Sequence, residues 1–204
     1  MPQIFLSYRT TDQAFAAAFF DSELTREFGA DAVFFASRSI PLGADWEQAM
    51  FDAVSRSEAV LVIIGPGWLT AADSTGRRRL DDPRDFVRRE VELALRLGKR
   101  VIPVHLERRH PLDDLPEPLR ELNEKQSTTV EFRNSKADLA RLATRLRQQI
   151  PSLRPAPEPP SSHGNVDNST HNSISGGYFA GPVVQGKQIG GIFFNGGPEE
   201  TRRG

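Results

Sequence analysis

The 204-residue sequence has no cysteine and only four histidines, two methionines and two tryptophans. Without cysteine there can be no disulfide, no thiolate metal ligand and no cysteine nucleophile, which suits a reducing cytosol. The histidines show no HxxxH-type spacing, so neither a catalytic metal nor a metal cofactor is expected. Any chemistry must therefore come from carboxylates, hydroxyls, arginines and aromatic rings.

Neither sign of charge dominates, since 26 Lys and Arg face 27 Asp and Glu for a net charge of −1. No global field attracts nucleic acid or an anionic membrane, so no nucleic-acid partner is expected. The N-terminus lacks the basic segment and apolar run of a signal peptide. No apolar run approaches the ~20 residues of a membrane span. A cytoplasmic protein without a membrane span is expected.

Composition changes sharply near Ile150. Nine of the 16 glycines lie in residues 164–197, whereas residues 1–150 hold six. Residues 151–163 contain five prolines and no periodic apolar pattern, which is typical of a linker. The expected organisation is a globular domain (1–150), a Pro-rich linker (151–163), a Gly/Asn-rich tail (164–197) and a C-terminus without a core (198–204).

Within residues 1–150, strand-like and helix-like patterns alternate. Strands are expected at residues 3–7, 32–35, 59–64, 100–105 and 128–132. Helices are expected at residues 11–28, 45–56, 84–97 and 136–149, with Phe15, Ala18, Phe19 and Leu24 inward on the first and Trp46 inward on the second. The uniformly apolar residues 59–64 are typical of a central strand covered on both faces.

This alternation predicts an α/β fold, namely a flavodoxin-like doubly wound five-stranded parallel sheet with helices on both faces. Ligands in such folds bind outside the carboxyl ends of the strands. The loops after Ser7, Phe35 and Ile64 are therefore where chemistry is expected.

One carboxylate does not suit its surroundings. At about 100° per residue, Glu90 is the only charge on the stripe Phe86–Glu90–Leu93–Leu97, whose spacing indicates burial. Burying an ionised carboxylate is costly unless it is paired or its pKa rises. In one interpretation, Glu90 bonds a backbone amide or pairs with Arg9 to hold two elements together. In the other, it lines a cleft and acts on a substrate.

The motifs of residues 3–149 resemble, in order and spacing, those of Toll/interleukin-1 receptor (TIR) domains of the bacterial NAD⁺-degrading type. Residues 4–9, IFLSYR, resemble the first box, a buried strand ending in Ser-Tyr-Arg. Residues 39–43, SIPLG, resemble the BB loop, the segment that controls assembly in the family. Residues 85–91, DFVRREV, resemble the motif in which an aromatic residue precedes a helical glutamate by four. Residues 99–104 resemble the following strand.

The resemblance implies that Glu90 is the catalytic residue and that NAD⁺ is the substrate, with no cofactor. Tyr8 and Arg9 are then expected to meet the nicotinamide-proximal phosphate or ribose; a structural hydroxyl and a solvated guanidinium are the alternatives. Trp46 is expected either to stack on a ring of the substrate or to join the core. Phe86 stands where many catalytic members have tryptophan, which preserves an aromatic face.

Further residues of this rim are expected to contribute less. Ser37 and Arg38 are expected to touch the substrate from the same side as Trp46. In the BB loop, Ile40, Pro41 and Gly43 are expected to mediate assembly. Because the resemblance implies that a neighbouring subunit's BB loop completes the site, a homo-oligomer is expected.

The tail carries only two formal charges between residues 164 and 197, and asparagines and apolar residues recur along it. High β-propensity with low charge is typical of cross-β stacking. Part of the tail resembles the glutamine-centred core of amyloid signalling motifs, including RHIM-like ones: Val184, Gln185, Gly186, Gln188, Ile189 and Gly190. The expected partners are other copies of the chain and a protein bearing a matching motif; an unstructured tail is the alternative.

Together these features predict an NAD⁺ glycohydrolase that releases nicotinamide and ADP-ribose or its cyclic form on self-assembly, in immune, anti-phage or stress signalling. The alternative is a non-catalytic TIR adaptor, which would have no use for a carboxylate in an apolar stripe. A phosphoacceptor receiver is disfavoured, because Ser7, Tyr8 and Gly65 stand where receivers need acidic residues.

Overall fold

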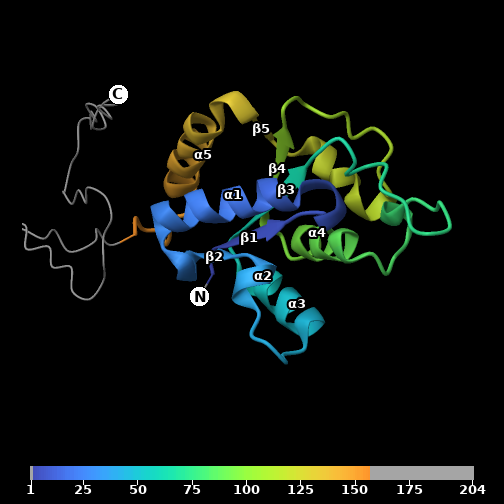
Figure 1. Cartoon of the computed structure of the whole chain (residues 1–204), viewed down its shortest axis with the longest axis horizontal. Helices are drawn as coiled ribbons and strands as arrows, with labels where there is room; N and C mark the ends of the chain where they lie inside the picture. The colour runs from blue at the N-terminus through green and yellow to red at the C-terminus, as the bar shows by residue number, and fades with distance from the viewer. Residues whose placement is uncertain (1, 157–204) are drawn as a thin grey trace, which may run out of the picture. The chain divides into compact units, whose positions relative to one another are not determined.

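A five-stranded parallel sheet runs through residues 2–156, the part of the chain that the structure, a computed structural model, describes (Figure 1). Its strand order is β2-β1-β3-β4-β5 and every neighbouring pair is parallel. The strands are β1 (Ile4–Ser7), β2 (Val33–Phe34), β3 (Ala59–Ile64), β4 (Arg100–Leu106) and β5 (Thr128–Val130). The predicted doubly wound fold is confirmed.

Helices cover both faces of the sheet. On one face lie α1 (Thr10–Phe28) and α5 (Ser135–Gln149). The other face is covered by α3 (Trp46–Arg56), α4 (Phe86–Arg96) and the 3₁₀ helix η3 (Glu117–Glu124). The remaining short helices lie in connections: η1 (Ala30–Ala32), α2 (Ala36–Ser39), η2 (Arg79–Asp81) and η4 (Phe132–Asn134).

The central strand β3 forms the middle of both cores. All six of its side chains are fully buried, alternately against the α1–α5 face and the α3–α4 face. A parallel strand between two helical layers has no face for a polar side chain, which is why its sequence is apolar throughout. The prediction of a central strand is confirmed.

The predicted inner face of the first helix is confirmed at Leu24 and partly at Phe19, which packs against the core, but it is wrong at Phe15 and Ala18. Phe15 is 94% exposed and Ala18 is also exposed, while the buried residues are Ala17, Phe20, Leu24 and Phe28. The backbone of Gln13 is not helical (φ −137°, ψ 36°), so the first turn is out of phase with the rest. Residues 14–20 are all apolar, so their pattern does not single out one face.

Two other aromatic residues were misplaced by sequence pattern. Trp46 was expected to face inward on its helix, but it is 46% exposed at the first position of α3. Phe132 was expected in the last strand, but β5 ends at Val130 and Phe132 is exposed in η4. Both side chains stand at element ends, where one side of the backbone is open to solvent.

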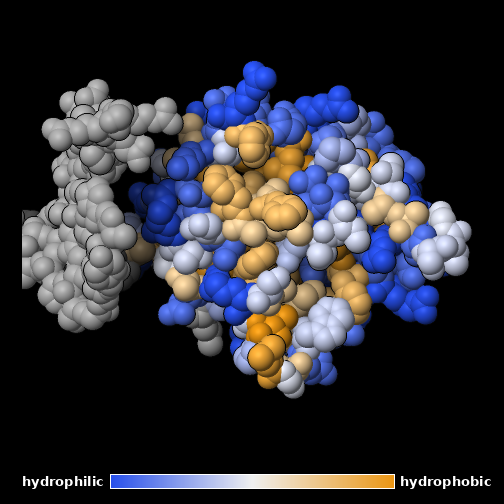
Figure 2. Space-filling view, viewed as in Figure 1, coloured by the Kyte–Doolittle hydropathy of each residue, from blue (hydrophilic) through white to orange (hydrophobic). Residues whose placement is uncertain are grey.

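Apolar side chains gather over α1 and the β5–α5 connection (Figure 2). They border a groove of about 360 Å³. The exposed rings of Phe15 and Phe132 stand at this groove, with Phe19, Leu106 and Val130 beneath them. Contiguous exposed apolar surface of this kind is typical of a protein-binding face.

The described chain continues past the expected domain boundary. Leu153 is buried with the α1–α5 core, and the N–H of Ala156 donates to the carbonyl of Glu27 at 2.8 Å. The rest of the expected linker, the Gly/Asn-rich tail with its motif at residues 184–190, and residues 198–204 lie outside the described residues. Those expectations stay predictions.

Within residues 2–156, no helix combines the length and the apolar character that crossing a membrane requires. In the same range, no three His, Asp or Glu side chains gather where they could hold a metal ion.

Candidate functional site

Glu90 is buried in the middle of α4, with 5% of the residue exposed. It shares the inner face with Val87, Val91 and Ala94, at the i, i+3, i+4, i+7 spacing of a buried helix face. The predicted burial of Glu90 is confirmed. The fully buried face of α4, however, is this one and not the predicted stripe Phe86–Glu90–Leu93–Leu97. Leu97 is half exposed at the C-cap, because α4 ends at Arg96.

Ser7 holds the Glu90 carboxyl group. It is the last residue of β1 and is fully buried, and its hydroxyl donates to Oε2 of Glu90 at 2.6 Å. The carboxyl end of a parallel strand faces the helix that covers that end of the sheet, which brings residues 83 positions apart into contact. Ser7 therefore occupies one carboxyl oxygen, and no group among the described residues donates a hydrogen bond to the other, Oε1.

Arg9 pairs with Asp85 and not with Glu90. Its guanidinium donates twice, from Nη1 to Oδ2 of Asp85 at 2.9 Å and from Nη2 to Oδ1 at 3.1 Å, and both side chains are buried. Asp85 also caps α4, since its Oδ1 accepts the N–H of Arg88 at 3.0 Å. The interpretation in which Glu90 pairs with Arg9 is therefore wrong, and so is a solvated Arg9.

Burial raises the pKa of Glu90 from 4.5 to about 8. The hydrogen bond from Ser7 and the charge of Arg9 lower this pKa, while the charge of Asp85 raises it. Glu90 is therefore mostly protonated at neutral pH in the unliganded chain. A positive charge placed next to it would favour its ionised form.

A cavity of about 240 Å³ lies beside Glu90. Aromatic rings border it, because Trp46 and Phe86 meet edge to face with their centroids 4.3 Å apart. The remaining lining residues are Phe5, Leu6, Tyr8, Arg9, Thr10, Thr11, Ala36, Met50, Arg79, Asp85 and Val87. Pockets for whole small molecules span roughly 300–1,000 Å³. This cavity can therefore enclose a ring and a sugar, while the rest of a dinucleotide would lie outside it.

The structure brings only some of the predicted rim residues to this cavity. Tyr8 lines it, stacks on Phe35 and lies 3.4 Å from the hydroxyl of Ser37. Ser37 is outside the lining and reaches the cavity only through Tyr8. Arg38 is held away from the cavity, pairing with Asp21 at 2.7 Å. Successive residues of a helix point about 100° apart, so Ser37 and Arg38 cannot both face the site.

The BB loop, residues 39–43, joins α2 to α3 and has one partly buried and one exposed end. Ile40 packs against the core of the α3–α4 face, whereas Pro41 and Gly43 are exposed. Leu42, between them, is fully exposed. Gly43 has φ +82°, a conformation that glycine adopts without strain, and this shapes the loop tip.

Sequence patterns missed Asp85 and Arg79. Asp85 stands directly before a helix, where aspartate is a favoured N-cap, so the cap was detectable although its pairing with Arg9 was not. Arg79 lies in the charged run of residues 77–82, which is typical of a solvated loop, yet it lines the cavity with its Nη1 3.9 Å from Oδ2 of Asp85. No local sequence signal predicts that Arg79 lines the cavity, because its position depends on the fold of the loop at residues 72–78.

A family model described as "TIR domain" matches residues 4–146. Similar solved structures include the TIR domain of the Toll-related receptor TRR-2 from Hydra magnipapillata, with 14% identity, 72% of this chain and 99% of that chain covered, and a TM-score of 0.46. A metazoan TIR-STING receptor from C. gigas in complex with 2′,3′-cGAMP has 22% identity, coverage of 70% and 40%, and a TM-score of 0.46. The TIR domains of the activated Roq1 resistosome, which recognises the pathogen effector XopQ, have 14% identity, coverage of 74% and 99%, and a TM-score of 0.48. At such identities these likenesses concern the fold alone. No curated protein matched the chain.

Proposed function

Because this chain belongs to the TIR domain family, we propose that it cleaves the nicotinamide–ribose bond of NAD⁺, with Glu90 as the catalytic residue. The observation that carries this proposal is a buried carboxyl group that forms no ion pair with any cation among residues 2–156 and stands beside a cavity. Strongly perturbed carboxyl groups in cavities are enriched at functional sites. The proposed biological role is immune, anti-phage or stress signalling.

The chemistry suits these residues. Nicotinamide leaves as a neutral molecule, so its departure needs no strong general acid, and the ribose passes through an oxocarbenium-like state. An ionised carboxylate in a cavity with little water stabilises that developing positive charge and accepts hydrogen bonds from ribose hydroxyls. In the proposed complex, Trp46 and Phe86 contact the nicotinamide ring and Glu90 contacts the ribose. Water or the adenine ring then attacks the anomeric carbon of the ribosyl cation, which gives ADP-ribose or its cyclic form.

The rest of the substrate is proposed to lie against three further residues of the cavity lining: Tyr8, Arg9 and Arg79. In Arg9 both terminal nitrogens bond Asp85, and its buried Nε has no hydrogen-bond partner among the described residues. Arg79 is partly exposed at the cavity wall, so its guanidinium is placed to meet a substrate phosphate. Tyr8 is placed to donate its hydroxyl to a ribose or phosphate oxygen.

The pH profile tests the ionisation of Glu90. We expect kcat/KM for nicotinamide release to fall as the pH drops below about 8, because the free chain then holds a protonated Glu90. The kcat limb should lie at lower pH, since the positive charge of the nicotinamide ring favours the carboxylate in the complex. Nicotinamide release measured by HPLC between about pH 6 and 9 gives both limbs.

Ser7→Ala supplies the matched variant for that profile. Because the Ser7 hydrogen bond lowers the pKa of Glu90, its loss should move the kcat/KM limb to higher pH. Ser7→Thr, which keeps a hydroxyl, should restore the limb. A limb that stays in place in Ser7→Ala, or a flat wild-type profile, would contradict the assignment of the titrating group.

Assembly is proposed to complete the site. The cavity beside Glu90 is smaller than the substrate, and an exposed Leu42 stands at the tip of the nearby BB loop. If a second copy of this chain buries Leu42, the contact is stabilised by ~25 cal/mol for each Å² of apolar surface removed from water. The tail at residues 164–197 is proposed to raise the local concentration of TIR domains through amyloid-like stacking with other copies or a matching partner.

Leu42→Asp is expected to abolish most of the activity gained on raising the protein concentration, because a carboxylate would be desolvated at the contact. Specific activity and sedimentation velocity, measured over a concentration series, check this result. Leu97→Asp, a half-exposed leucine at the end of α4, is the matched control and should behave as the wild type. If the activity of both variants depended equally on protein concentration, the BB loop would take no part in assembly.

A non-catalytic adaptor is the second candidate function. The apolar groove bordered by Phe15 and Phe132 favours it, since contiguous exposed apolar surface is typical of protein-binding faces. An adaptor would assemble with the same concentration dependence but release no nicotinamide at any concentration. That outcome would replace the enzymatic proposal.

A further inference from the structure

Two aromatic rings in the wall of the Glu90 cavity stand at the first positions of neighbouring helices. Phe86 begins α4 and packs against the core of that face, whereas Trp46 begins α3 and is 46% exposed. The rings meet edge to face with their centroids 4.3 Å apart. Because the core does not enclose Trp46, its position depends on how the first turn of α3 is held against α4.

Arg89 links the two helices at this end. Its guanidinium carbon lies over two rings, 4.3 Å from the centroid of Phe51 on α3 and 5.5 Å from that of Phe86. Its Nη1 lies 2.7 Å from Oε1 of Glu47, the residue that follows Trp46. Aromatic faces attract a cation within about 6 Å of the ring centroid. Arg89 therefore contacts one ring of the pair directly and holds the neighbour of the other.

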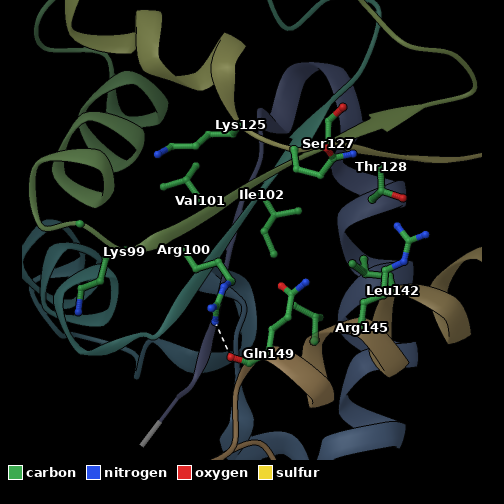
Figure 3. Close-up of a pocket in the computed structure, with 13 residues that line it drawn as sticks. Lys99, Arg100, Val101, Ile102, Lys125, Ser127, Thr128, Leu142, Arg145 and Gln149 are labelled. Carbon is green, nitrogen blue, oxygen red and sulfur yellow. Dashed lines mark hydrogen bonds between the residues drawn. The ribbon is translucent and has the colours of Figure 1, made fainter.

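This use of an arginine differs from helix capping, which Arg100 illustrates. Arg100 donates to the carbonyl of Gln149 at 2.7 Å, where α5 ends (Figure 3). Such a contact satisfies a backbone group that the helix leaves open. The Arg89 side chain donates to no carbonyl among residues 2–156, and its ion pair with Glu47 is partly exposed, so it contributes little to the stability of the fold. Its place beside the cavity wall needs another explanation.

We propose that Arg89 is a positioning residue, which holds the first turn of α3 against α4 so that Trp46 and Phe86 are in place for the nicotinamide ring. This inference rests on the proposed cleavage of NAD⁺. Arg89 does not line the cavity, so it acts only through Phe86 and Glu47. A wall whose rings are already ordered binds a ligand more tightly, because less side-chain freedom is lost on binding.

Two variants with opposite changes of charge test the proposal. Arg89→Met keeps an apolar stem but loses the cation, whereas Glu47→Gln loses the anion. Because both free Trp46, both should raise KM for NAD⁺ by about three- to tenfold, the range of one aromatic contact. A contact made equally with substrate and transition state changes KM and not kcat. HPLC of nicotinamide release over a series of NAD⁺ concentrations gives both constants.

The fluorescence of Trp46 reports its position without turnover. The other tryptophan, Trp68, is fully buried, so acrylamide in solution quenches mainly Trp46. Quenching should increase in Arg89→Met and in Glu47→Gln, since about half of the Trp46 surface can still become exposed. Arg96→Met, which removes an exposed cation from the end of the same helix, is the matched control and should behave as the wild type.

The outcomes separate positioning from a structural or a purely electrostatic role. Increased KM and increased quenching in both variants support the proposal. Unchanged quenching overturns it, whatever the melting temperature measured by circular dichroism. KM values that move in opposite directions in the two variants also overturn it, because the effect then follows charge and not the position of Trp46. If the wild type releases no nicotinamide, the enzymatic proposal fails by itself, and the quenching still decides whether Arg89 positions Trp46.

Discussion

Glu90→Gln is expected to lower nicotinamide release by at least about a hundredfold, the effect of removing one preorganised group that stabilises transition-state charge. The amide has nearly the shape of the carboxyl group and can still accept the Ser7 hydroxyl, but it cannot carry the negative charge that the ribosyl cation needs. HPLC of NAD⁺ and nicotinamide with concentrated protein gives the rate. Glu92→Gln, on the solvent side of the same helix, is the matched control and should keep near-wild-type activity.

The same variant should be more stable than the wild type at alkaline pH. Burial raises the pKa of Glu90 above its unfolded value, so the stability tied to its protonated form is fully present below about pH 4.5 and is lost as the pH rises through about 8. A glutamine does not ionise, so Glu90→Gln should gain up to a few kcal/mol over the wild type at pH 9 and nothing near pH 4.

Thermal melting of the two proteins across this pH range distinguishes a functional from a structural carboxyl group. A higher melting temperature with lost turnover indicates that the protein keeps a destabilising carboxylate for its chemistry. A lower melting temperature at every pH would identify Glu90 as a structural residue. Normal turnover in Glu90→Gln would discard the enzymatic proposal.

Asp85→Ala is expected to lower the free energy of unfolding by about 3–5 kcal/mol, the usual cost of breaking a buried ion pair on one side. It leaves Arg9 buried without its carboxylate and removes the N-cap of α4, which alone contributes ~1 kcal/mol. Urea unfolding at equilibrium measures the change. The other side chain near Asp85 is Arg79, at 3.9 Å, and this second cation cannot replace the lost carboxylate.

Asp82→Ala provides the control, because the partner of Asp82 is the exposed Arg84 and such pairs contribute about 0–1 kcal/mol. The double variant Arg9→Met/Asp85→Ala should recover part of the lost stability, since no unpaired charge stays buried. A loss in Asp85→Ala no larger than that in Asp82→Ala would show that the Arg9–Asp85 pair contributes little to stability.

Much of the fold followed from local pattern. Residues 59–64 could only be a doubly covered strand, because an uninterrupted apolar run has no side that tolerates water. Pattern failed where it carried no information, as in residues 14–20, which are apolar on every side. There the irregular backbone at Gln13 and the packing of α1 on the sheet decided that Phe20 is buried and Phe15 exposed.

The candidate site divides in the same way. Helical periodicity alone predicted that Glu90 is buried, since an amphipathic helix has one face for the core. Periodicity could not show whether Glu90 or Asp85 takes Arg9, because that choice depends on how β1 docks against a helix 76 to 83 residues later. The sequence by itself determined which side chains leave water where the pattern has a clear period, as at residues 59–64 and at Glu90, because burial on one face of an element is then a local property. Only the tertiary structure decided the burial of residues 14–20 and which buried side chains meet, because both depend on the packing of distant segments of the whole sheet.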